Sequence, residues 1–248
     1  MTRVPAGYQP APGLLAQRVV LVTGAGGGLG RATALACAGA GATVVLLGRA
    51  VPGLERVYDE IKEAGGGEPA LYPLNLAGAT WNDYEQLGET LAREFGRLDA
   101  LAHCAAHFKS FAPLATVEPP DWLESLQVNL TGPFALTRHC LPLLEHSGAA
   151  SVVFVSDAAG RGGKAYAGPY GVAKFAIEGL MQTWAPELEA THVRVNSLDP
   201  GPMDTALRRK GYADGARAPS PVAAARALLW LLGPDSRPAT ATAFSLRA

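Results

Sequence analysis

A tyrosine and a lysine four residues apart are the residues in this sequence best suited to proton transfer. Tyr170 and Lys174 stand in the run YGVAK, within a segment that has a helical pattern. A spacing of four places both side chains on one face of a helix. A lysine ammonium beside a phenol stabilises the phenolate, so Tyr170 is predicted to exchange a proton nearer neutral pH than its reference pKa of about 10. The alternative is an ordinary surface pair.

A glycine-rich run directly follows an aliphatic segment near the N-terminus. The segment Val19–Thr23 leads into TGAGGGLG at 23–30, and an apolar helical pattern comes next. In this context Gly24 permits a tight turn, Gly28 lets a pyrophosphate approach the backbone, and Gly30 lets helix and strand pack closely. The helix N-terminus would offer free N–H groups to the phosphates. The run therefore predicts a dinucleotide site, with a flexible glycine turn as the alternative.

The end of the second aliphatic segment bears on which dinucleotide would bind. An acidic residue there would hold the ribose 2′-hydroxyl of NAD(H), but this chain has LLGRA at 46–50. No carboxylate is available to repel a 2′-phosphate, and Arg49 can make charge-assisted hydrogen bonds to it. NADP(H) is therefore predicted over NAD(H); the alternative is that Arg49 only faces solvent.

Four motifs stand in the order typical of the short-chain dehydrogenase/reductase family, which the chain resembles over nearly its whole length. They are the glycine run with Thr23, Gly24, Gly28 and Gly30, then Asn129 in VNLTG, then Tyr170 with Lys174, then Pro200, Gly201 and Thr205 after RVN. The resemblance implies hydride transfer between NADP(H) and a small carbonyl or alcohol substrate. It makes Tyr170 the general acid/base. Lys174 would bind the nicotinamide ribose and lower the pKa of Tyr170, and Asn129 would hold a water of a proton relay.

Segments near both termini resemble one bacterial subgroup of the family, the YciK-like oxidoreductases. These segments are YQP at 8–10 with LL at 14–15, and LWLLGPDSR at 229–237. The subgroup has no firm substrate to transfer. Relatives in the family form oligomers through the Tyr–Lys helix and the helix before it, so the resemblance implies a homodimer or homotetramer.

The resemblance also places further residues in the cofactor site. They are Leu29, Asn75, Leu76, Cys104, Ala105 and Ala106. The backbone of Ala105 and Ala106 can line the adenosine ribose, although the family's side-chain amide is lost there. The Asn75 carbonyl can accept a hydrogen bond from the adenine amine. Cys104 is interpreted as a buried small residue rather than a nucleophile.

The sequence departs from the family where a serine hydroxyl should donate a hydrogen bond to the substrate. The family has Ser thirteen residues before the Tyr, but that position is Asp157 here, and Ser156 precedes it. An ionised Asp157 cannot donate to a developing alkoxide and would repel it. It would also raise the pKa of Tyr170. This departure leaves three interpretations open.

In the first interpretation, Asp157 works protonated or with a positively charged substrate such as a protonated imine. Pteridine reductases resemble the chain here, because they carry Asp at this spacing. In the second, a local bulge brings Ser156 into the serine's place, and carbonyl reduction is ordinary. In the third, catalysis is impaired and the protein is an NADP(H)-binding scaffold. The geometry of the two side chains distinguishes the first two interpretations.

Charged residues near the expected substrate side also admit two interpretations. Arg208, Arg209 and Lys210 stand in the segment 202–219, which corresponds to the family's substrate lid. They could attract an anionic substrate, or they are a solvated charge run. His107 could bind substrate, or it is a loop histidine satisfied by water.

Short aliphatic runs alternate with helical patterns and must position all of these residues. Seven runs are predicted to be strands: Val19–Thr23, Thr43–Leu47, Ala70–Leu74, Leu98–Cys104, Ser151–Val155, Val193–Leu198 and Ala241–Ser245. Residues 52–64 and 80–95 carry apolar stripes at helical spacing. The alternation predicts one domain over residues 1–248, a doubly wound Rossmann-type α/β fold with a seven-stranded, mainly parallel sheet and helices on both faces. Residues 1–12, rich in Pro and Gly, are expected to be a loose arm.

Composition argues against several other classes of function. Apolar residues make up 48% of the chain and charged residues 17%, which suits a globular core. A net charge of −1 gives no positive field, so neither nucleic acid nor a membrane surface is expected as a partner, and the expected partner is a small-molecule substrate. Three cysteines without a CxxC pair predict neither a disulfide framework nor a metal site. No segment resembles a signal peptide or a membrane span, which predicts a cytoplasmic protein.

Overall fold

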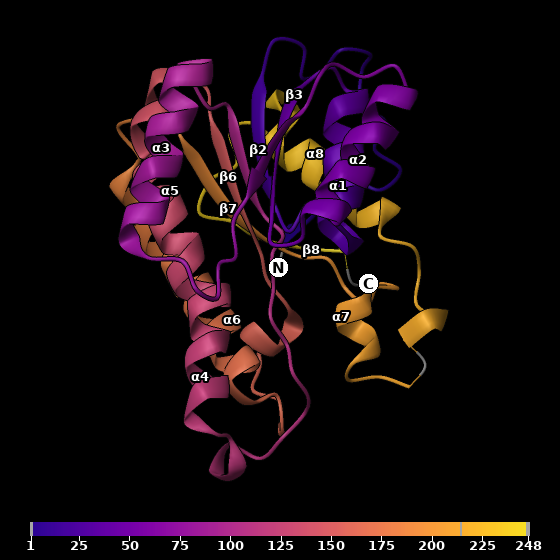
Figure 1. The fold of residues 1–248 in the computed structure, drawn as a ribbon, viewed down its shortest axis with the longest axis vertical. Coiled ribbons are helices and arrows are strands. Elements are labelled where there is room, and N and C mark those ends of the chain that lie inside the picture. The colour runs from indigo at the N-terminus through magenta and orange to yellow at the C-terminus, as the bar shows by residue number, and fades with distance from the viewer. Residues whose placement is uncertain (1, 214, 247–248) are drawn as a thin grey trace.

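An eight-stranded sheet forms the centre of the computed structural model, which describes residues 2–213 and 215–246 (Figure 1). The strands lie in the order β1-β8-β7-β6-β5-β2-β3-β4, and all neighbours are parallel. Their bounds are β1 Thr2–Arg3, β2 Val19–Thr23, β3 Thr43–Gly48, β4 Ala70–Pro73, β5 Ala100–His103, β6 Ser151–Val155, β7 Arg194–Asp199 and β8 Ala243–Ser245. The predicted parallel sheet is thus confirmed.

The prediction of seven strands is wrong by one, because β1 was not expected. Thr2 and Arg3 pair in parallel with Phe244 and Ser245 of β8. The loose arm predicted for residues 1–12 is therefore wrong at these two positions. Their Pro- and Gly-rich surroundings gave no strand signal, and their pairing depends on a partner at the other end of the chain.

Helices cover both faces of the sheet, as the doubly wound pattern predicts. α1, α2 and α8 lie on one face, whereas α3, α5 and α6 lie on the other (Figure 1). The helices are α1 Gly28–Gly39, α2 Val51–Glu63, α3 Trp81–Phe95, α4 Pro119–Leu126, α5 Gly132–His146, α6 Gly168–Glu187, α7 Ala206–Arg209 and α8 Val222–Leu232. A π-helical turn, Gln127–Thr131, joins α4 to α5. None of the helices in the described ranges has both the length and the apolar character needed to cross a membrane.

Each face of the sheet has its own hydrophobic core. Along β2, Val20 and Val22 pack in the core with α1 and α8, whereas Val19 and Leu21 pack in the core with α3 and α5. Successive strand residues point to opposite faces, so a strand covered on both sides is apolar throughout. All five residues of β2 are buried, which fixes the end of the strand where the glycine run begins.

The order of the strands creates a crevice at their carboxyl ends. The chain builds outward from β2 through β3 to β4, and then returns to the other side of β2 with β5, β6, β7 and β8. In open α/β sheets, ligands bind where the order reverses in this way. The turns after β2 and β5 are neighbours there, because both strands pair directly. The fold therefore brings the glycine run and the segment after His103 to one site.

Candidate active site

A cavity of about 590 Å³ opens at the carboxyl ends of the strands and gathers most of the residues predicted from sequence. Of those residues, the ones that line it are Gly24, Gly28, Leu29, Gly30, Arg49, Cys104, Ala105, Ala106, Ser156, Asp157, Tyr170, Lys174, Pro200, Gly201 and Thr205. Asn75, Leu76 and Asn129 are not among the residues that line it. The volume lies within the range of small-molecule and cofactor sites, about 300 to 1,000 Å³.

The glycine turn has the tight geometry that the sequence predicts. Gly24 has a φ of +67°, and a Cβ there would lie 2.9 Å from Ala105 Cα. A Cβ on Gly30 would overlap the Gly24 carbonyl oxygen. Side chains at either position would push β2, β5 and α1 apart. Because α1 begins at Gly28, its free N–H groups lie at the cavity wall, where they can bind an anion.

Arg49 follows β3 and lines the same cavity, with its side chain exposed to solvent. The two positions around it, Gly48 and Ala50, carry no charge. The structure thus brings Arg49 to the cavity that the glycine turn borders and gives the site a cation at this end.

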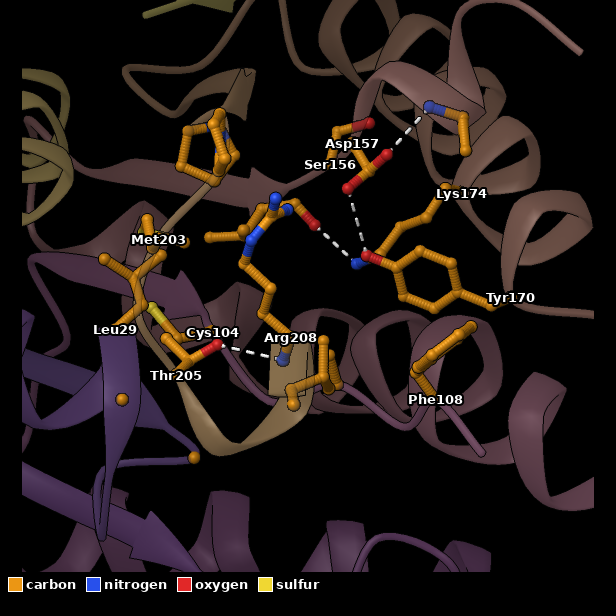
Figure 2. A pocket seen from close by; sticks show the side chains of 18 of the residues that line it. Leu29, Cys104, Phe108, Ser156, Asp157, Tyr170, Lys174, Met203, Thr205 and Arg208 are labelled. Atoms are coloured by element: carbon orange, nitrogen blue, oxygen red, sulfur yellow. Dashed lines mark hydrogen bonds between the residues drawn. The ribbon is translucent and has the colours of Figure 1, made fainter. Parts of the chain in front are cut away.

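Helix α6 brings Tyr170 and Lys174 together on the cavity wall (Figure 2). The Lys174 Nζ lies 5.5 Å from the centroid of the Tyr170 ring and donates a hydrogen bond of 2.7 Å to the Val155 carbonyl at the end of β6. Burial lowers the pKa of Lys174 to about 8. The ammonium is therefore held in place, but it has little solvent around it.

Asp157 contacts the tyrosine hydroxyl directly (Figure 2). Tyr170 Oη donates a long hydrogen bond of 3.4 Å to Asp157 Oδ2, and the Ala159 N–H donates one of 2.8 Å to Asp157 Oδ1. Burial raises the pKa of Tyr170 well above its ordinary value, and the negative charge of Asp157 raises it further. The shift has the direction predicted for Asp157, opposite to the lowering expected from Lys174. Tyr170 is a neutral phenol in this environment.

Ser156 does not take the place of Asp157 in this structure. It follows β6, and its N–H donates a hydrogen bond of 2.8 Å to the Leu198 carbonyl. Its side chain is buried beside the cavity, and its Oγ has no hydrogen-bond partner among the described residues. Asp157 therefore lies against the phenol without a bulge, and the Ser156 hydroxyl is left to bind another group.

Close packing fixes the loop that carries Asp157 against helix α6. A Cβ on Gly160 would lie 2.5 Å from the Lys174 carbonyl oxygen, so the two backbones touch. The next residue, Arg161, donates a hydrogen bond of 2.7 Å to Glu178, one helical turn beyond Lys174. Both partners of this ion pair are almost buried. The carboxylate of Asp157 and the phenol therefore have a fixed relation.

Asn129 lies in the π-helical turn, and its amide is already hydrogen-bonded by the chain. Nδ2 donates to the carbonyls of His107 and Ser125 at 2.8 and 2.9 Å, and Oδ1 accepts from the His107 N–H at 3.0 Å. These bonds hold the segment after β5 against α4 and the π-helical turn that follows it. Its role in a water relay stays a prediction from the resemblance. The Asn75 side chain bonds to the Ala77 N–H, 3.3 Å away, and Leu76 is buried.

The cysteine and histidines near the cavity take ordinary structural places. Cys104 is only half-buried at the cavity wall, so the prediction of a buried residue is wrong, but desolvation still raises its pKa to about 12 and its thiol stays protonated. His107 Nδ1 lies 3.3 Å from Glu124, although burial lowers the pKa of the histidine. His103 is buried and shares a hydrogen bond of 2.8 Å with Thr137. Neither histidine lines the cavity.

Sequence reasoning missed the outer wall of the cavity. The wall is formed by Phe108, Phe111, Lys164 and Tyr212, and the cavity also takes in Met203 and, from the predicted charge run, Arg208. Met203 and Tyr212 lie in the predicted lid segment, but single residues in irregular segments have no periodicity, so no signal marked these individual side chains. Within the predicted lid 202–219, α7 begins after Thr205, whose hydroxyl accepts from the Arg208 N–H. Residue 214 of this segment lies outside the described residues.

Comparison with known proteins assigns the chain to a family. Residues 18–215 match the family described as short chain dehydrogenase, and the chain belongs to this family of oxidoreductases. It is 39% identical over 239 residues to the uncharacterized oxidoreductase YciK of Escherichia coli K12, covering 96% of this chain and 94% of that protein. The predicted resemblance to the family and to its YciK-like subgroup is thereby confirmed.

Two solved structures share the fold closely. A putative short chain dehydrogenase from Pseudomonas syringae has a TM-score of 0.93 and 44% identity, covering 97% of this chain and 99% of that one. A putative short chain dehydrogenase from Escherichia coli CFT073, complexed with NADPH, has a TM-score of 0.93 and 38% identity, covering 96% of this chain and 100% of that one.

Proposed function

We propose that the protein is an NADP(H)-dependent oxidoreductase that interconverts a small carbonyl compound and its alcohol, with Tyr170 as the general acid/base. The observation that carries the proposal is the position of the Tyr170 hydroxyl. The side chain lines the cavity that the glycine turn borders, and the Lys174 Nζ lies 5.5 Å from the centroid of its ring. The relative from Escherichia coli CFT073, complexed with NADPH, supports this cofactor.

The residues present fit such a dinucleotide. Gly24 and Gly30 leave space that a Cβ would fill, and the start of α1 presents N–H groups to a pyrophosphate. Arg49 would bind the 2′-phosphate, and the unpartnered Ser156 hydroxyl would offer a hydrogen bond at the inner end of the cavity. The nicotinamide, when bound, supplies or takes up the hydride.

The chain's own residues would manage the proton. The raised pKa of Tyr170 keeps its proton in place near neutral pH, so the phenol can donate it to the substrate oxygen as negative charge develops there. The Lys174 ammonium would stabilise the phenolate that remains. Asp157 would orient the phenol through their hydrogen bond while opposing the phenolate charge.

The contact between Asp157 and Tyr170 favours a second candidate substrate class, the protonated imines and pterins. A carboxylate next to the reacting atoms stabilises a positively charged C=N group and disfavours an alkoxide. In this reading Asp157 is itself a catalytic residue, and the function differs from the first only in the substrate.

NADPH oxidation measured over a panel of aldehydes, ketones, cyclic imines and pterins tests the proposal. We expect calorimetry to show NADPH binding and at least one of the four classes to be reduced. If the purified protein binds NADPH but does not oxidise it in the presence of any member of the panel, the scaffold interpretation replaces the proposal. If it binds neither NADPH nor NADH, the assignment of the cavity fails.

Reversing the charge at Arg49 is expected to change the cofactor preference. In Arg49→Asp the carboxylate would repel the 2′-phosphate and accept a bond from the ribose 2′-hydroxyl of NADH instead. A charge-assisted hydrogen bond contributes about 1.5 to 3 kcal/mol, so the Kd for NADPH should rise at least about tenfold. Calorimetry with both cofactors measures the effect as a change in the ratio of the two Kd values. An unchanged ratio of the two Kd values would show that Arg49 only faces solvent.

We further propose that residues 1–248 form one domain and that the protein is cytoplasmic. In this proposal it assembles as a homodimer or homotetramer and acts on small molecules. Large apolar side chains are exposed along α4 and α6, among them Leu123, Val172 and Phe175, and they support association through these helices. The three free cysteines are compatible with a reducing compartment.

A further inference from the structure

A row of aromatic rings leads away from Tyr170 along the outer wall of the cavity. Phe108 packs edge-on against Tyr170 with ring centroids 5.4 Å apart (Figure 2). Phe111 packs against Phe108 at 5.1 Å, and Tyr212 of the lid segment packs against Phe111 at 5.3 Å. All four rings line the cavity. The wall would therefore pack well against an apolar or aromatic substrate whose reacting atom lies at Tyr170.

Two cations contact Tyr212, the last ring of this row. Lys164 Nζ donates a hydrogen bond of 2.7 Å to Tyr212 Oη and lies 4.8 Å from the centroid of the Phe111 ring. The Arg208 guanidinium lies over the ring of Tyr212, 4.0 Å from its centroid. Figure 2 shows Arg208 extending from the lid segment toward the space that Asp157, Tyr170 and Lys174 surround.

Neither cation has an anionic partner in the part of the chain that the structure describes. No carboxylate lies within 4 Å of Lys164 or Arg208, although Arg209 pairs with Asp204 at 2.6 Å and Lys109 pairs with Asp121 at 2.5 Å. Arg208 Nε is buried without a hydrogen-bond partner among the described residues. A buried N–H group of a guanidinium without an acceptor is unfavourable, so a ligand oxygen is the natural acceptor. Arg209 and Lys109, which are paired, do not line the cavity.

The charges give the cavity a direction. Asp157 contacts Tyr170, the first ring of the aromatic row, whereas Lys164 and Arg208 both contact the ring of Tyr212, the last one. We propose that the substrate is an anion whose carboxylate binds Lys164 and Arg208, with an apolar ring-bearing body along Phe108 and Phe111 and its carbonyl or imine carbon at Tyr170. This inference rests on the proposed function, because it names the substrate class of the same site.

A phosphate of the cofactor, rather than the substrate carboxylate, is the other candidate partner for Arg208. Thr205, which caps α7, lies beside the glycine turn, since a Cβ on Gly28 would be 3.4 Å from its methyl carbon. Arg208 is one helical turn further along and could instead reach a cofactor phosphate. Lys164 contacts Phe111 and Tyr212 at the outer wall, so it reports on the substrate end.

Matched acids and esters test the proposal by binding rather than by turnover. The probes are 4-formylbenzoate and the longer 4-formylcinnamate, each compared with its methyl ester, titrated calorimetrically into the protein saturated with NADP⁺. The ester has the shape of the acid without its charge. We expect at least one acid to bind about tenfold more tightly than its ester, in keeping with the strength of a charge-assisted hydrogen bond.

Single substitutions assign the effect to residues. Lys164→Gln and Arg208→Gln should each lower the ratio of ester Kd to acid Kd about tenfold. Lys164→Arg, which keeps the charge, should restore much of it. Arg209→Gln is the matched control, because Arg209 adjoins Arg208, carries the same charge and pairs with Asp204. Thermal melting checks that each variant is folded.

The outcomes separate this inference from the proposed function. Equal binding of acids and esters by the parent, or an equal effect of Arg209→Gln, overturns the inference. A higher Kd for NADPH in Arg208→Gln with an unchanged acid preference would assign Arg208 to the cofactor and remove it from the substrate site. If acids bind preferentially but neither these probes nor any member of the substrate panel oxidises NADPH, the proposed reaction fails and the anion site stands. The same comparison made without NADP⁺ applies if no cofactor binds.

Discussion

Tyr170→Phe is expected to lower NADPH oxidation with the preferred substrate about a thousandfold while leaving the Kd for NADPH nearly unchanged. Positioned proton transfer contributes about 10²- to 10⁴-fold to a rate, and no described side chain other than Asp157 accepts a hydrogen bond from the Tyr170 hydroxyl. The substitution removes one oxygen and keeps the ring that packs against Phe108. Stopped-flow turnover and calorimetric NADPH binding, measured on the same preparation, provide the two readouts.

A nearby tyrosine provides the control for this prediction. Tyr166 is 61% exposed and does not line the cavity, so Tyr166→Phe should leave the rate within about twofold. Turnover of Tyr170→Phe at the parent rate would remove Tyr170 from its proposed role.

The reduction rate of the parent protein should also depend on the protonation of Lys174. The pKa of Lys174 is about 8, so its ammonium is present below about pH 8 and is lost as the pH rises through that value. The reduction rate should therefore fall in this pH range.

Asp157→Ser is expected to change which substrates are reduced. The serine hydroxyl can donate to a developing alkoxide, and the repelling charge is gone. Removing one such donor costs about 10²- to 10³-fold in well-studied enzymes, so carbonyl reduction should rise by about tenfold or more. Reduction of imines and pterins should fall, because the carboxylate that stabilises their positive charge is lost. Steady-state rates for matched carbonyl and imine substrates measure both changes.

The pH dependence of Asp157→Ser supplies a second readout. Asp157 raises the pKa of Tyr170 and also raises that of Lys174, so both values should be lower in the variant. Alcohol oxidation needs the phenolate as base, and its alkaline onset should therefore move to lower pH. Asp157→Asn is the matched variant, because it removes the charge without supplying a hydroxyl. If carbonyl and imine rates fall together in both variants and the alkaline onset does not move, Asp157 acts only through packing.

The inner half of the site was predictable because its signals are local in sequence. One short segment contains β2 and the glycines that follow it, Gly24, Gly28 and Gly30. Another short segment contains Tyr170 and Lys174, which are four residues apart. Counting thirteen residues back from the tyrosine also reached Asp157. Only the structure shows whether Ser156 or Asp157 faces the phenol, because residue types alone do not predict a bulge at the end of a strand.

The outer half depends on contacts between distant segments. Phe111 and Tyr212 are 101 residues apart, and Lys164 contacts both from a third segment. No pattern within one segment indicates that these three meet. The first strand was missed for the same physical reason, because two residues gain strand geometry only through their partner in β8. Asn75 and Leu76 followed from the family position alone, and neither lines the cavity: Asn75 is exposed and Leu76 is buried.

The backbone contact at Gly160 bears on how this scaffold can acquire new chemistry. The loop and helix α6 touch main chain to main chain there, and the Asp157 carboxylate also accepts a hydrogen bond from the Ala159 N–H. The backbone contact at Gly160 does not itself depend on whether residue 157 carries a hydroxyl or a carboxylate. The exchange of this one residue is therefore expected to redirect the scaffold between oxygen and nitrogen substrates without disturbing that contact.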